Sequence, residues 1–403
     1  MDHAVTMSPL ADADRLAIDR IFAVAPELFA LERAADRLHL GRHELLHAGP
    51  PLRDPCAPCT PVLHSAMVAI LLEGWADTAD QARDMVRSGA ISLRPAQDFA
   101  CVVPLADVLS PSMWVQVVRD AANPDRWACS PLNGGATDVM RLGQFNDAVL
   151  AQLRWLDREF APTYGAALAR AAIPLIPLAD EGLAAGDDCH GKTVAATAAF
   201  TRLLQDRLQG DAAQTCIAFL ERSPAVFLNL WMAASRCMLS AAAGCTGSSV
   251  VIAGAGNGQD FGIQLAGKPG HWFTAPAAAP VIPGATEQAL QASLGAIGDS
   301  AIVDLLGLGA MTTLGNGAQP PAGFVSIWPE TALAPRKLLS APHPGFTQTK
   351  AQLVVRAASV MDAETSPVVS LGVLDKSGLG RVGGGVYRAP AELFARACAG
   401  LQP

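Results

Sequence analysis

Residues Gly186-Asp187-Asp188-Cys189-His190-Gly191-Lys192-Thr193 form a dense polar stretch between two alanine-rich segments that predict helices. The stretch concentrates charge in a chain of which only 16% is charged. If it is partly buried, each charge needs a partner or a shifted pKa, which is how reactive groups usually arise. The alternative is a polar turn in which Asp187 or Asp188 caps the helix that follows. Both interpretations stay open on spacing alone.

Length and hydropathy predict a soluble, cytoplasmic protein of more than one packed unit. A chain of 403 residues is long enough for two or three such units. No apolar run reaches the roughly 18 residues that a membrane span needs. Residues 225–243 come nearest, but Asn229, Arg236 and two serines interrupt them and favour a buried core helix. The acidic N-terminus is unlike a signal peptide.

Charge and cysteine usage exclude several classes of partner. A net charge of −8 without a basic run argues against nucleic acid. Nine scattered cysteines are typical of reduced thiols rather than of a disulfide framework. Cys56 and Cys59 form a lone C-x-x-C without a second pair at zinc-ribbon spacing. No metal site and no cofactor are predicted from these residues, and whether a metal or nucleotide is bound stays open.

The order of strand-like and helix-like patterns along the chain predicts an α+β protein in three parts. Residues 1–140 are expected to form an N-terminal α/β unit, in which short apolar runs punctuated by proline predict strands from 91 to 118. Residues 141–246 are expected to be a helical subdomain, because the 146–241 block needs no strand. Start signals for its helices are Asn146, Pro162 and Pro224. Residues 247–403 return to strand-like patterns and predict a C-terminal α/β unit.

Two glycine-rich segments of the last part bear on binding. Gly254-Ala255-Gly256-Asn257-Gly258 follows a predicted strand, but the next residues are strand-like, whereas a dinucleotide site requires a helix there. A turn between two strands that presents Asn257 and Asp260 is the better interpretation. Near the C-terminus, Gly383-Gly384-Gly385 lets the backbone approach a ligand or another strand, and Lys376 lies just before it.

Two other segments place polar groups at the start of helices. The Pro–Cys loop delivers Arg53 to the beginning of a helix predicted from about 62 to 75. Gly298-Asp299-Ser300 opens an apolar helix, where Asp299 or Ser300 can act as a cap and the free amides suit an anion.

A series of uncommon strings resembles the YlbE-like proteins (domain of unknown function 1116) almost from end to end. The segments that carry the resemblance are residues 47–51, 72–76, 110–113, 132–135, 153–155, 186–193, 227–230, 257–263, 272–276 and 298–302. Members of that family resemble one subunit of a multi-subunit carbamoyltransferase of purine and allantoin breakdown, which interconverts oxalurate with oxamate and carbamoyl phosphate. The resemblance implies a FdrA-like partner subunit, a further small subunit and α/β units of unusual topology with a helical domain between them.

The chain departs from that family's pattern in several places. Asp188, His190 and Lys192 keep the charge types of the polar motif. A His-rich segment of the family is replaced by residues 95–99, and two family arginines are replaced by Gly256 and Gln264. Arginine binds phosphate and carboxylate bidentately, so these losses predict a weaker anion site or a less charged substrate.

The leading hypothesis is an enzyme subunit that acts on a carbamoyl, ureido or amide group. Such a transfer needs a proton moved, an oxyanion stabilised and a leaving anion held. His190 is the candidate acid–base and Asp187 or Asp188 the group that orients it. The candidate substrate-binding residues are Arg53, Lys192, Asn229, Asn257, Asp260, Asp299, Ser300 and Lys376.

Alternatives remain open. One is a non-catalytic or scaffolding subunit, and another is a diverged amide-processing enzyme with a different substrate. A metal-dependent hydrolase built on residues 187–190 is disfavoured, because adjacent side chains point in different directions. The oligomeric state is also open, and a homo-oligomer is one of the alternatives.

Overall fold

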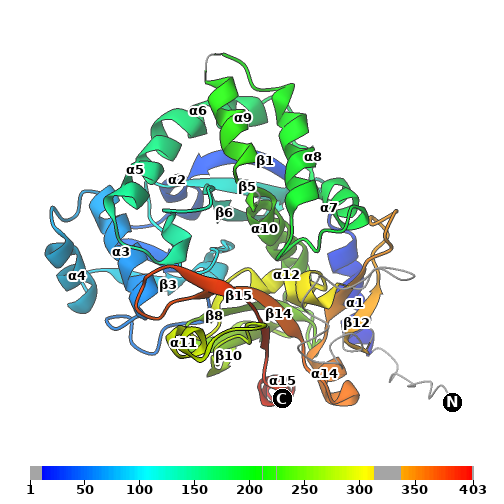
Figure 1. The fold of residues 1–403 in the computed structure, drawn as a ribbon. Helices are drawn as coiled ribbons and strands as arrows, with labels where there is room; N and C mark the ends of the chain where they lie inside the picture. The colour runs from blue at the N-terminus through cyan, green and yellow to red at the C-terminus, as the bar shows by residue number, and fades with distance from the viewer. Residues whose placement is uncertain (1–10, 211, 224, 313–336, 402–403) are drawn as a thin grey trace.

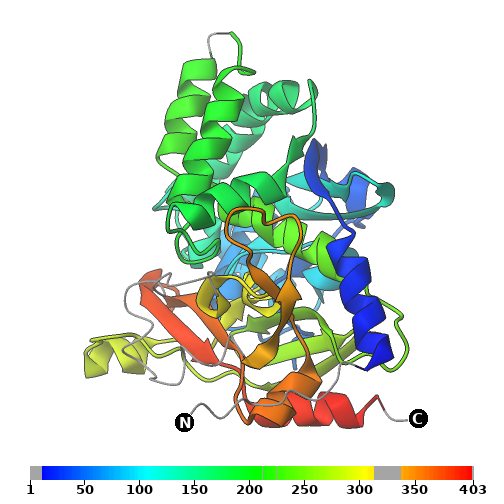
Figure 2. The same cartoon turned by 90° about the vertical axis from the view of Figure 1, so that its right-hand side faces the viewer.

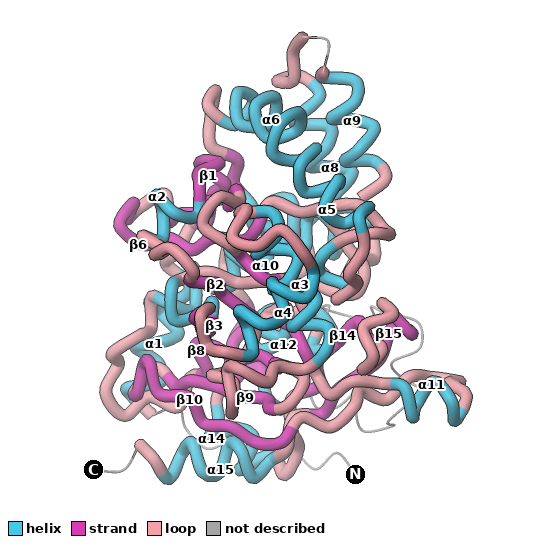
Figure 3. The backbone as a smooth tube through the Cα atoms, turned by 90° about the vertical axis from the view of Figure 1, so that its left-hand side faces the viewer, coloured by secondary structure: helices cyan, strands magenta, loops and turns pink. Residues whose placement is uncertain are grey.

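A computed structural model describes residues 11–210, 212–223, 225–312 and 337–401 of the chain (Figure 1). It combines helices with several small sheets, so the prediction of an α+β protein is confirmed. Helices α5, α6, α8 and α9 gather at one end of the molecule, and α14 and α15 lie at the other end (Figures 1 and 3). No helix among the described residues is long and apolar enough to cross a membrane.

The first sheet is antiparallel, with strand order β6-β5-β1-β7. Strand β5 shows why it forms: Val115 and Val117 are buried against one cluster of the core and Val118 against another. A strand with both faces covered is apolar on both faces. The elements of this region are α1 Asp12–Phe22, β1 Pro26–Arg33, α2 Ala34–Leu38, β5 Trp114–Asp120 and β6 Asn123–Pro131.

A second small sheet has the order β3-β2-β4, with β2 parallel to β3 and antiparallel to β4. Helices α3 and α4 accompany it. Thr78 begins α4 through a reciprocal capping box with Gln81. The bounds are β2 Glu44–His47, α3 Thr60–Leu72, α4 Ala79–Arg87, β3 Ser92–Pro95, η1 Ala96–Phe99 and β4 Val108–Leu109.

The central segment is mainly helical, as predicted, but not wholly so. Ile173 and Pro174 form a two-residue strand that pairs with Leu28 and Glu27 of β1. The prediction that no strand is needed between 146 and 241 is therefore wrong here, because this segment extends the first sheet by one edge strand. The bounds are η2 Met140–Leu142, α5 Asp147–Trp155, η3 Leu156–Phe160 (a π-helical turn), α6 Ala161–Leu168, β7 Ile173–Pro174, α7 Leu175–Ala184, α8 Val194–Gln205, α9 Ala213–Glu221 and α10 Val226–Ser240.

The helix starts within this segment follow the predicted signals. Asn146 caps α5 by accepting a hydrogen bond from the amide of Val149, and Pro162 lies in the first turn of α6. Pro224 lies outside the described residues. Helix α10 is the buried core helix predicted from 225 to 243, and it packs against β5 and β6 of the first sheet and against β8 and α12 of the last part.

The last part contains the antiparallel sheet β10-β9-β8-β11 and the hairpins β12-β13 and β14-β15. Gly258 and Gln259 form the turn between β8 and β9, which confirms the glycine turn between two strands. The bounds are β8 Val251–Asn257, β9 Asp260–Leu265, β10 Lys268–Pro276, α11 Glu287–Ala292, β11 Ile297–Gly298, α12 Ala301–Leu306, η4 Gly309–Met311, β12 Leu339–Pro342, β13 Gln352–Val355, α14 Ala357–Ala363, β14 Val368–Leu374, β15 Arg381–Arg388 and α15 Ala391–Ala399.

Buried carboxylates connect segments that are distant in the sequence. Asp14 of α1 accepts hydrogen bonds from Ser248 and Ser249, so the first helix is fixed to the start of β8. Figure 2 shows α1, in blue, beside the elements of the last part. Asp299 accepts hydrogen bonds from the amides of Gly49 and Val103. These contacts join the predicted N- and C-terminal units, and the three-part division remains a prediction about the sequence.

Candidate functional site

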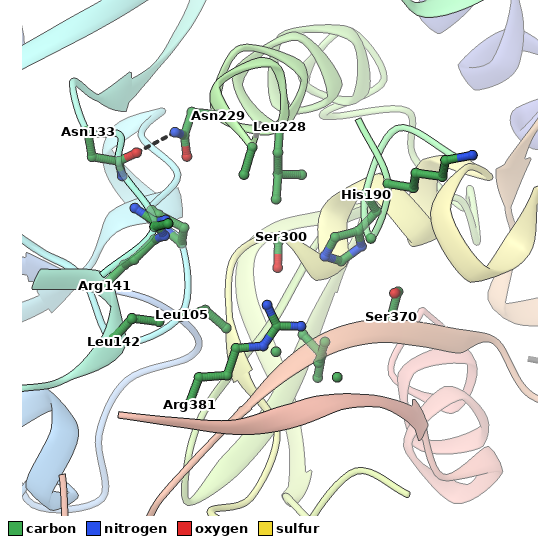
Figure 4. Close-up of a pocket in the computed structure, with 18 of the residues that line it drawn as sticks. Leu105, Asn133, Arg141, Leu142, His190, Leu228, Asn229, Ser300, Ser370 and Arg381 are labelled. Atoms are coloured by element: carbon green, nitrogen blue, oxygen red, sulfur yellow. Dashed lines mark hydrogen bonds between the residues drawn. The ribbon is translucent and has the colours of Figure 1, made fainter. Parts of the chain in front are cut away.

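A cavity of about 960 Å³ lies where the three parts of the chain meet. Its walls come from the loop after β6, the loop between α7 and α8, helix α10 and the β14-β15 hairpin (Figure 4). Leu105, Leu142 and Leu228 supply apolar surface. Polar side chains from the same segments interrupt this apolar surface, and a concave site that combines both is typical of small-molecule binding.

The polar stretch 186–193 contributes Asp188, His190 and Lys192 to the cavity lining, and His190 is the imidazole among them. Its Nδ1 lies 2.5 Å from a carboxylate oxygen of Asp304 on α12. The two side chains are almost fully buried, at 4% and 0% exposure. The opposite edge of the ring faces the cavity, since His190 lines it (Figure 4). This is the geometry of a proton-transfer group oriented by a carboxylate.

Competing effects set the pKa of His190. Burial lowers the pKa, but the charge and hydrogen bond of Asp304 and the charge of Asp188 outweigh burial, so the pKa is raised above 6.5. The carboxylate of Asp304 is held in place by the amides of Ala310 and Ser370. The imidazole is thus oriented by a residue that the sequence analysis missed. A carboxylate inside the apolar run 301–308 was the available signal, because such a group needs a buried partner.

The two aspartates expected to orient His190 contact other groups. Asp187 accepts a hydrogen bond of 2.9 Å from the amide of Ala196, in the first turn of α8. Asp188 accepts 2.8 Å hydrogen bonds from the amides of His190 and Lys192 and so folds the loop. The helix-capping interpretation therefore applies to Asp187, and the same loop still delivers His190 to the cavity.

Two arginines that the sequence analysis did not single out also reach the cavity. Arg141 lies in η2 and donates to the carbonyl oxygens of Gly134 and Gly135, at 3.3 and 2.5 Å. Arg381 begins β15 and donates to Gly383 at 2.8 Å. Neither forms an ion pair with a carboxylate in the described part of the chain. The sequence signal for a binding arginine was a nearby glycine-rich segment, Gly134-Gly135 for Arg141 and Gly383-Gly384-Gly385 for Arg381.

The two guanidinium groups are close enough to affect each other. Burial lowers the pKa of Arg141, the charge of Asp107 opposes that shift, and the charge of Arg381 adds to it. Figure 4 shows the guanidinium of Arg381 directed toward Ser300 in the middle of the cavity, and Arg141 beside the loop that carries Asn133. Two guanidinium groups that line one cavity are suited to bind an anion, and Asp107 is the carboxylate whose charge partly offsets that of Arg141.

A chain of polar side chains forms another wall. Asn229 of α10 donates to Asn133, and Asn133 donates to Asp107 at 3.0 Å. Asp107 is buried, which raises its pKa to about 6 although Asn133, Arg141 and the amide of Val108 act to lower it. Asp107 accepts hydrogen bonds at both carboxylate oxygens, from the amide of Val108 and from Asn133, and these bonds stabilise its ionised form.

Lys192 and Ser300 line the same cavity. The ammonium of Lys192 donates to the carbonyl oxygen of Gly186 at 2.9 Å. The hydroxyl of Ser300 points inward (Figure 4). Asp299 does not line the cavity: it is fully buried and accepts hydrogen bonds from Gly49, Gln97 and Val103.

The remaining predicted binding residues lie outside the cavity lining. Arg53 and Asp260 form a bidentate pair with each other, at 2.7 and 2.5 Å. Asn257 stabilises the β8-β9 turn by accepting from the amides of Gln259 and Asp260. Lys376 is exposed in the β14-β15 turn.

Comparisons with known proteins agree on one relationship. A family model described as "Oxamate carbamoyltransferase subunit AllG" matches residues 91–300. The oxamate carbamoyltransferase subunit AllG of Escherichia coli strain K12 is 30% identical over 97% of both chains. The chain belongs to the AllG family.

Other relatives fit this assignment. The uncharacterized protein YahG of Escherichia coli strain K12 is 27% identical over 98% of this chain and 87% of its own length. A crystal structure of a conserved protein of unknown function from Enterococcus faecalis V583 has the same fold, with a TM-score of 0.86, 24% identity and 96% of each chain covered. The predicted resemblance to an oxamate carbamoyltransferase subunit is confirmed in this form, and the YlbE-like name remains a prediction.

The two positions at which arginines are replaced, Gly256 and Gln264, lie in neighbouring strands of the last part. Gly256 lies in β8, where a Cβ atom would be 2.1 Å from the carbonyl oxygen of Ala296. Gln264 of β9 donates to Asp98 and accepts from Gly270. Neither position lines the cavity, whereas Arg141 and Arg381 do. The cationic character of the cavity therefore does not depend on positions 256 and 264.

The polar stretch has no metal-binding geometry. Among the described residues, no group of three or more His, Cys, Asp or Glu side chains is placed to hold a metal ion. Cys189 is fully buried with a positive φ of 65°, and its thiol lies 3.7 Å from the carbonyl oxygen of Ala179. The side chains of 187–190 thus point to four different surroundings.

Proposed function

We propose that this AllG-family chain holds the substrates of a carbamoyl transfer in its cavity, with His190 as the group that exchanges the proton. One observation carries the proposal: the buried His190–Asp304 pair faces the guanidinium groups of Arg141 and Arg381 across one cavity. An anionic substrate held by the arginines would present its reacting atom to the imidazole. Oxamate, the anion in the relative's name, carries a carboxylate beside an amide.

The proposed reaction balances without a cofactor. The amide nitrogen of oxamate attacks the carbonyl carbon of carbamoyl phosphate, a C–N bond forms, and the C–O bond to phosphate breaks. The nitrogen loses one proton, which His190 accepts at the ring nitrogen that faces the cavity. In the reverse direction, phosphorolysis of oxalurate, protonated His190 returns that proton to the leaving nitrogen. The products are then oxamate and carbamoyl phosphate.

The electrostatics of the cavity support these roles. A general acid works best when its pKa lies near the working pH, and the pKa of His190 is raised by Asp304. Guanidinium groups bind carboxylate and phosphate with paired hydrogen bonds, and Arg141 and Arg381 both line the cavity. Ser300 and Lys192 are further donors on the lining.

The proposal includes partners. The relative is named as a subunit, so we expect this chain to act in a complex. A FdrA-like subunit and a further small subunit are the proposed partners, and breakdown of purines through allantoin is the proposed setting. The acceptor can also be a ureido or amide compound other than oxamate.

The test is phosphate release from carbamoyl phosphate by the assembled complex, with and without oxamate. His190→Asn should lower turnover by about 10²–10⁴-fold, the usual contribution of general acid–base catalysis. His39→Asn is the matched control, because His39 is exposed and has a left-handed backbone that asparagine tolerates. Unchanged turnover in His190→Asn would contradict the role of His190 and favour a scaffolding subunit.

Anion binding is tested separately on the chain itself. Arg381→Ala should weaken oxamate binding in calorimetry by about 10–100-fold, since a hydrogen bond to a charged group is worth about 1.5–3 kcal/mol. Arg83→Ala is the control, because Arg83 pairs with Asp80 on the exposed face of α4. Equal binding by both variants would mean that the anion does not lie at Arg381.

A further inference from the structure

A chain of three polar side chains leads from a buried carboxylate to the cavity wall. Asp107 lies just before β4, Asn133 follows β6, and Asn229 belongs to α10. The side-chain nitrogen of Asn133 donates to Asp107 at 3.0 Å, and that of Asn229 donates to the oxygen of Asn133 (Figure 4). Asp107 and Asn229 are each 4% exposed.

Asp107 fixes the direction of every bond in this chain. Both oxygens of Asp107 accept hydrogen bonds, one from the amide of Val108 and one from Asn133, so Asn133 turns its NH2 group toward Asp107. The oxygen of Asn133 then faces Asn229, which has to turn its own NH2 group outward from the cavity. The remaining polar atom of the Asn229 side chain is its carbonyl oxygen, which accepts no hydrogen bond from a described residue. It points into the cavity (Figure 4).

The cavity therefore has two chemically different walls. The guanidinium groups of Arg141 and Arg381 only donate, whereas the wall at Asn229 offers an oriented acceptor. A ligand that satisfies both walls has a carboxylate or phosphate at one end and an N–H group at the other. A ligand with no N–H group leaves the oxygen of Asn229 without a partner, which costs binding free energy.

We infer that Asp107, acting through Asn133 and Asn229, makes the cavity select anions that carry an amide N–H group over anions of the same charge and shape that lack it. The inference rests on the proposed function, because it takes Arg141 and Arg381 as the anion site. Asp107 is a positioning residue and does not touch the ligand. Asn229 is the specificity-determining contact.

Oxamate and pyruvate are the probes, since both are planar monoanions and differ mainly in NH2 against CH3. Their dissociation constants are measured by calorimetry on the full chain. The native chain should prefer oxamate by about tenfold, the size expected of one hydrogen bond worth about 1.4 kcal/mol. Equal affinity for the two anions in the native chain would overturn the inference.

Two variants test whether Asp107 orients Asn229 through Asn133, an arrangement called the relay below. Asn229→Ala removes the acceptor and should bring the oxamate-to-pyruvate preference to about one. Asp107→Asn lets the new amide donate to Asn133, which reverses both following bonds and turns the NH2 group of Asn229 into the cavity. The preference should again fall to about one, although Asn229 is still present. Asp157→Asn, at a partly exposed carboxylate outside the cavity, should leave the preference unchanged.

The double variant Asp107→Asn/Asn229→Ala separates a relay from general damage. If Asp107 acts through Asn229, adding Asp107→Asn to Asn229→Ala changes the preference no further. A preference unchanged in Asp107→Asn with Asn229 intact would overturn the relay. Binding of neither anion to the native chain would overturn the proposed function and the inference together. Binding of both with equal affinity would overturn the inference alone.

Discussion

His190 and Asp304, 114 residues apart in the sequence, lie in contact at 2.5 Å beside the cavity. The loop 186–193 supplies the imidazole and α12 supplies the carboxylate, so the pair exists only when the central and last parts of the chain are folded together. Gly309, just after α12, allows this approach, because a Cβ atom there would lie 2.9 Å from the Cβ of His190. The pair is thus part of the fold as well as of the site.

Asp304→Asn should abolish the function of His190 while the residue itself stays. The amide keeps the contacts to Ala310 and Ser370 through its oxygen, but its NH2 group then faces Nδ1 of His190. The imidazole must accept there and carry its proton on the cavity side, which prevents it from acting as a base. Turnover should fall by about 10²–10⁴-fold. In the background of His190→Asn, the same substitution should lower turnover no further.

The same pair predicts how stability depends on pH. The pKa of His190 is raised in the folded state, so the protonated imidazole adds to the free energy of unfolding. This contribution is fully present below 6.5, the pKa of the unfolded state, and it is lost as pH rises through the higher pKa of the folded state. Urea unfolding of the native chain and Asp304→Asn should therefore differ more at about pH 6 than at about pH 9. A difference independent of pH would show that the imidazole does not become charged in this pair.

Asp187→Ala should destabilise the chain by about 1 kcal/mol, the usual cost of losing a helix cap. The carboxylate accepts from the amide of Ala196, in the first turn of α8. Asp187→Asn keeps an acceptor oxygen, so its free energy of unfolding should fall by less than that of Asp187→Ala. The free energy of unfolding is measured in urea, and a larger loss in Asp187→Asn than in Asp187→Ala would contradict the capping role.

Local features were predictable from the sequence, and the pairing of distant segments was not. The helix start at Asn146, the helix α10 and the β8-β9 turn depend on neighbouring residues and follow propensity and turn chemistry. The contact between His190 and Asp304 depends on how α12 packs, which local patterns do not encode. For the same reason, Arg141 and Arg381 were missed, since only the fold brings their loops together.

Gly256→Ala should destabilise the chain by about 1–3 kcal/mol through overpacking. The new Cβ would lie 2.1 Å from the backbone oxygen of Ala296, which cannot move away without disturbing the pairing of β8 with β11. Gly165→Ala is the control, because the added Cβ would meet Leu31 only at 3.7 Å within α6. The control should be neutral or stabilised by up to about 1 kcal/mol. Equal unfolding curves for the two variants would contradict this account of why position 256 is glycine.

Arg53→Ala should leave oxamate binding unchanged, although Arg53 was a candidate for the anion site. Its guanidinium pairs with Asp260, its side chain is 60% exposed, and neither residue lines the cavity. Exposed ion pairs are screened by water and salt, so stability should also change little. Calorimetry on Arg53→Ala and Arg381→Ala, measured side by side, checks the assignment. If Arg53→Ala lost binding and Arg381→Ala did not, the anion site would lie near the β8-β9 turn, and the cavity at His190 would need another ligand.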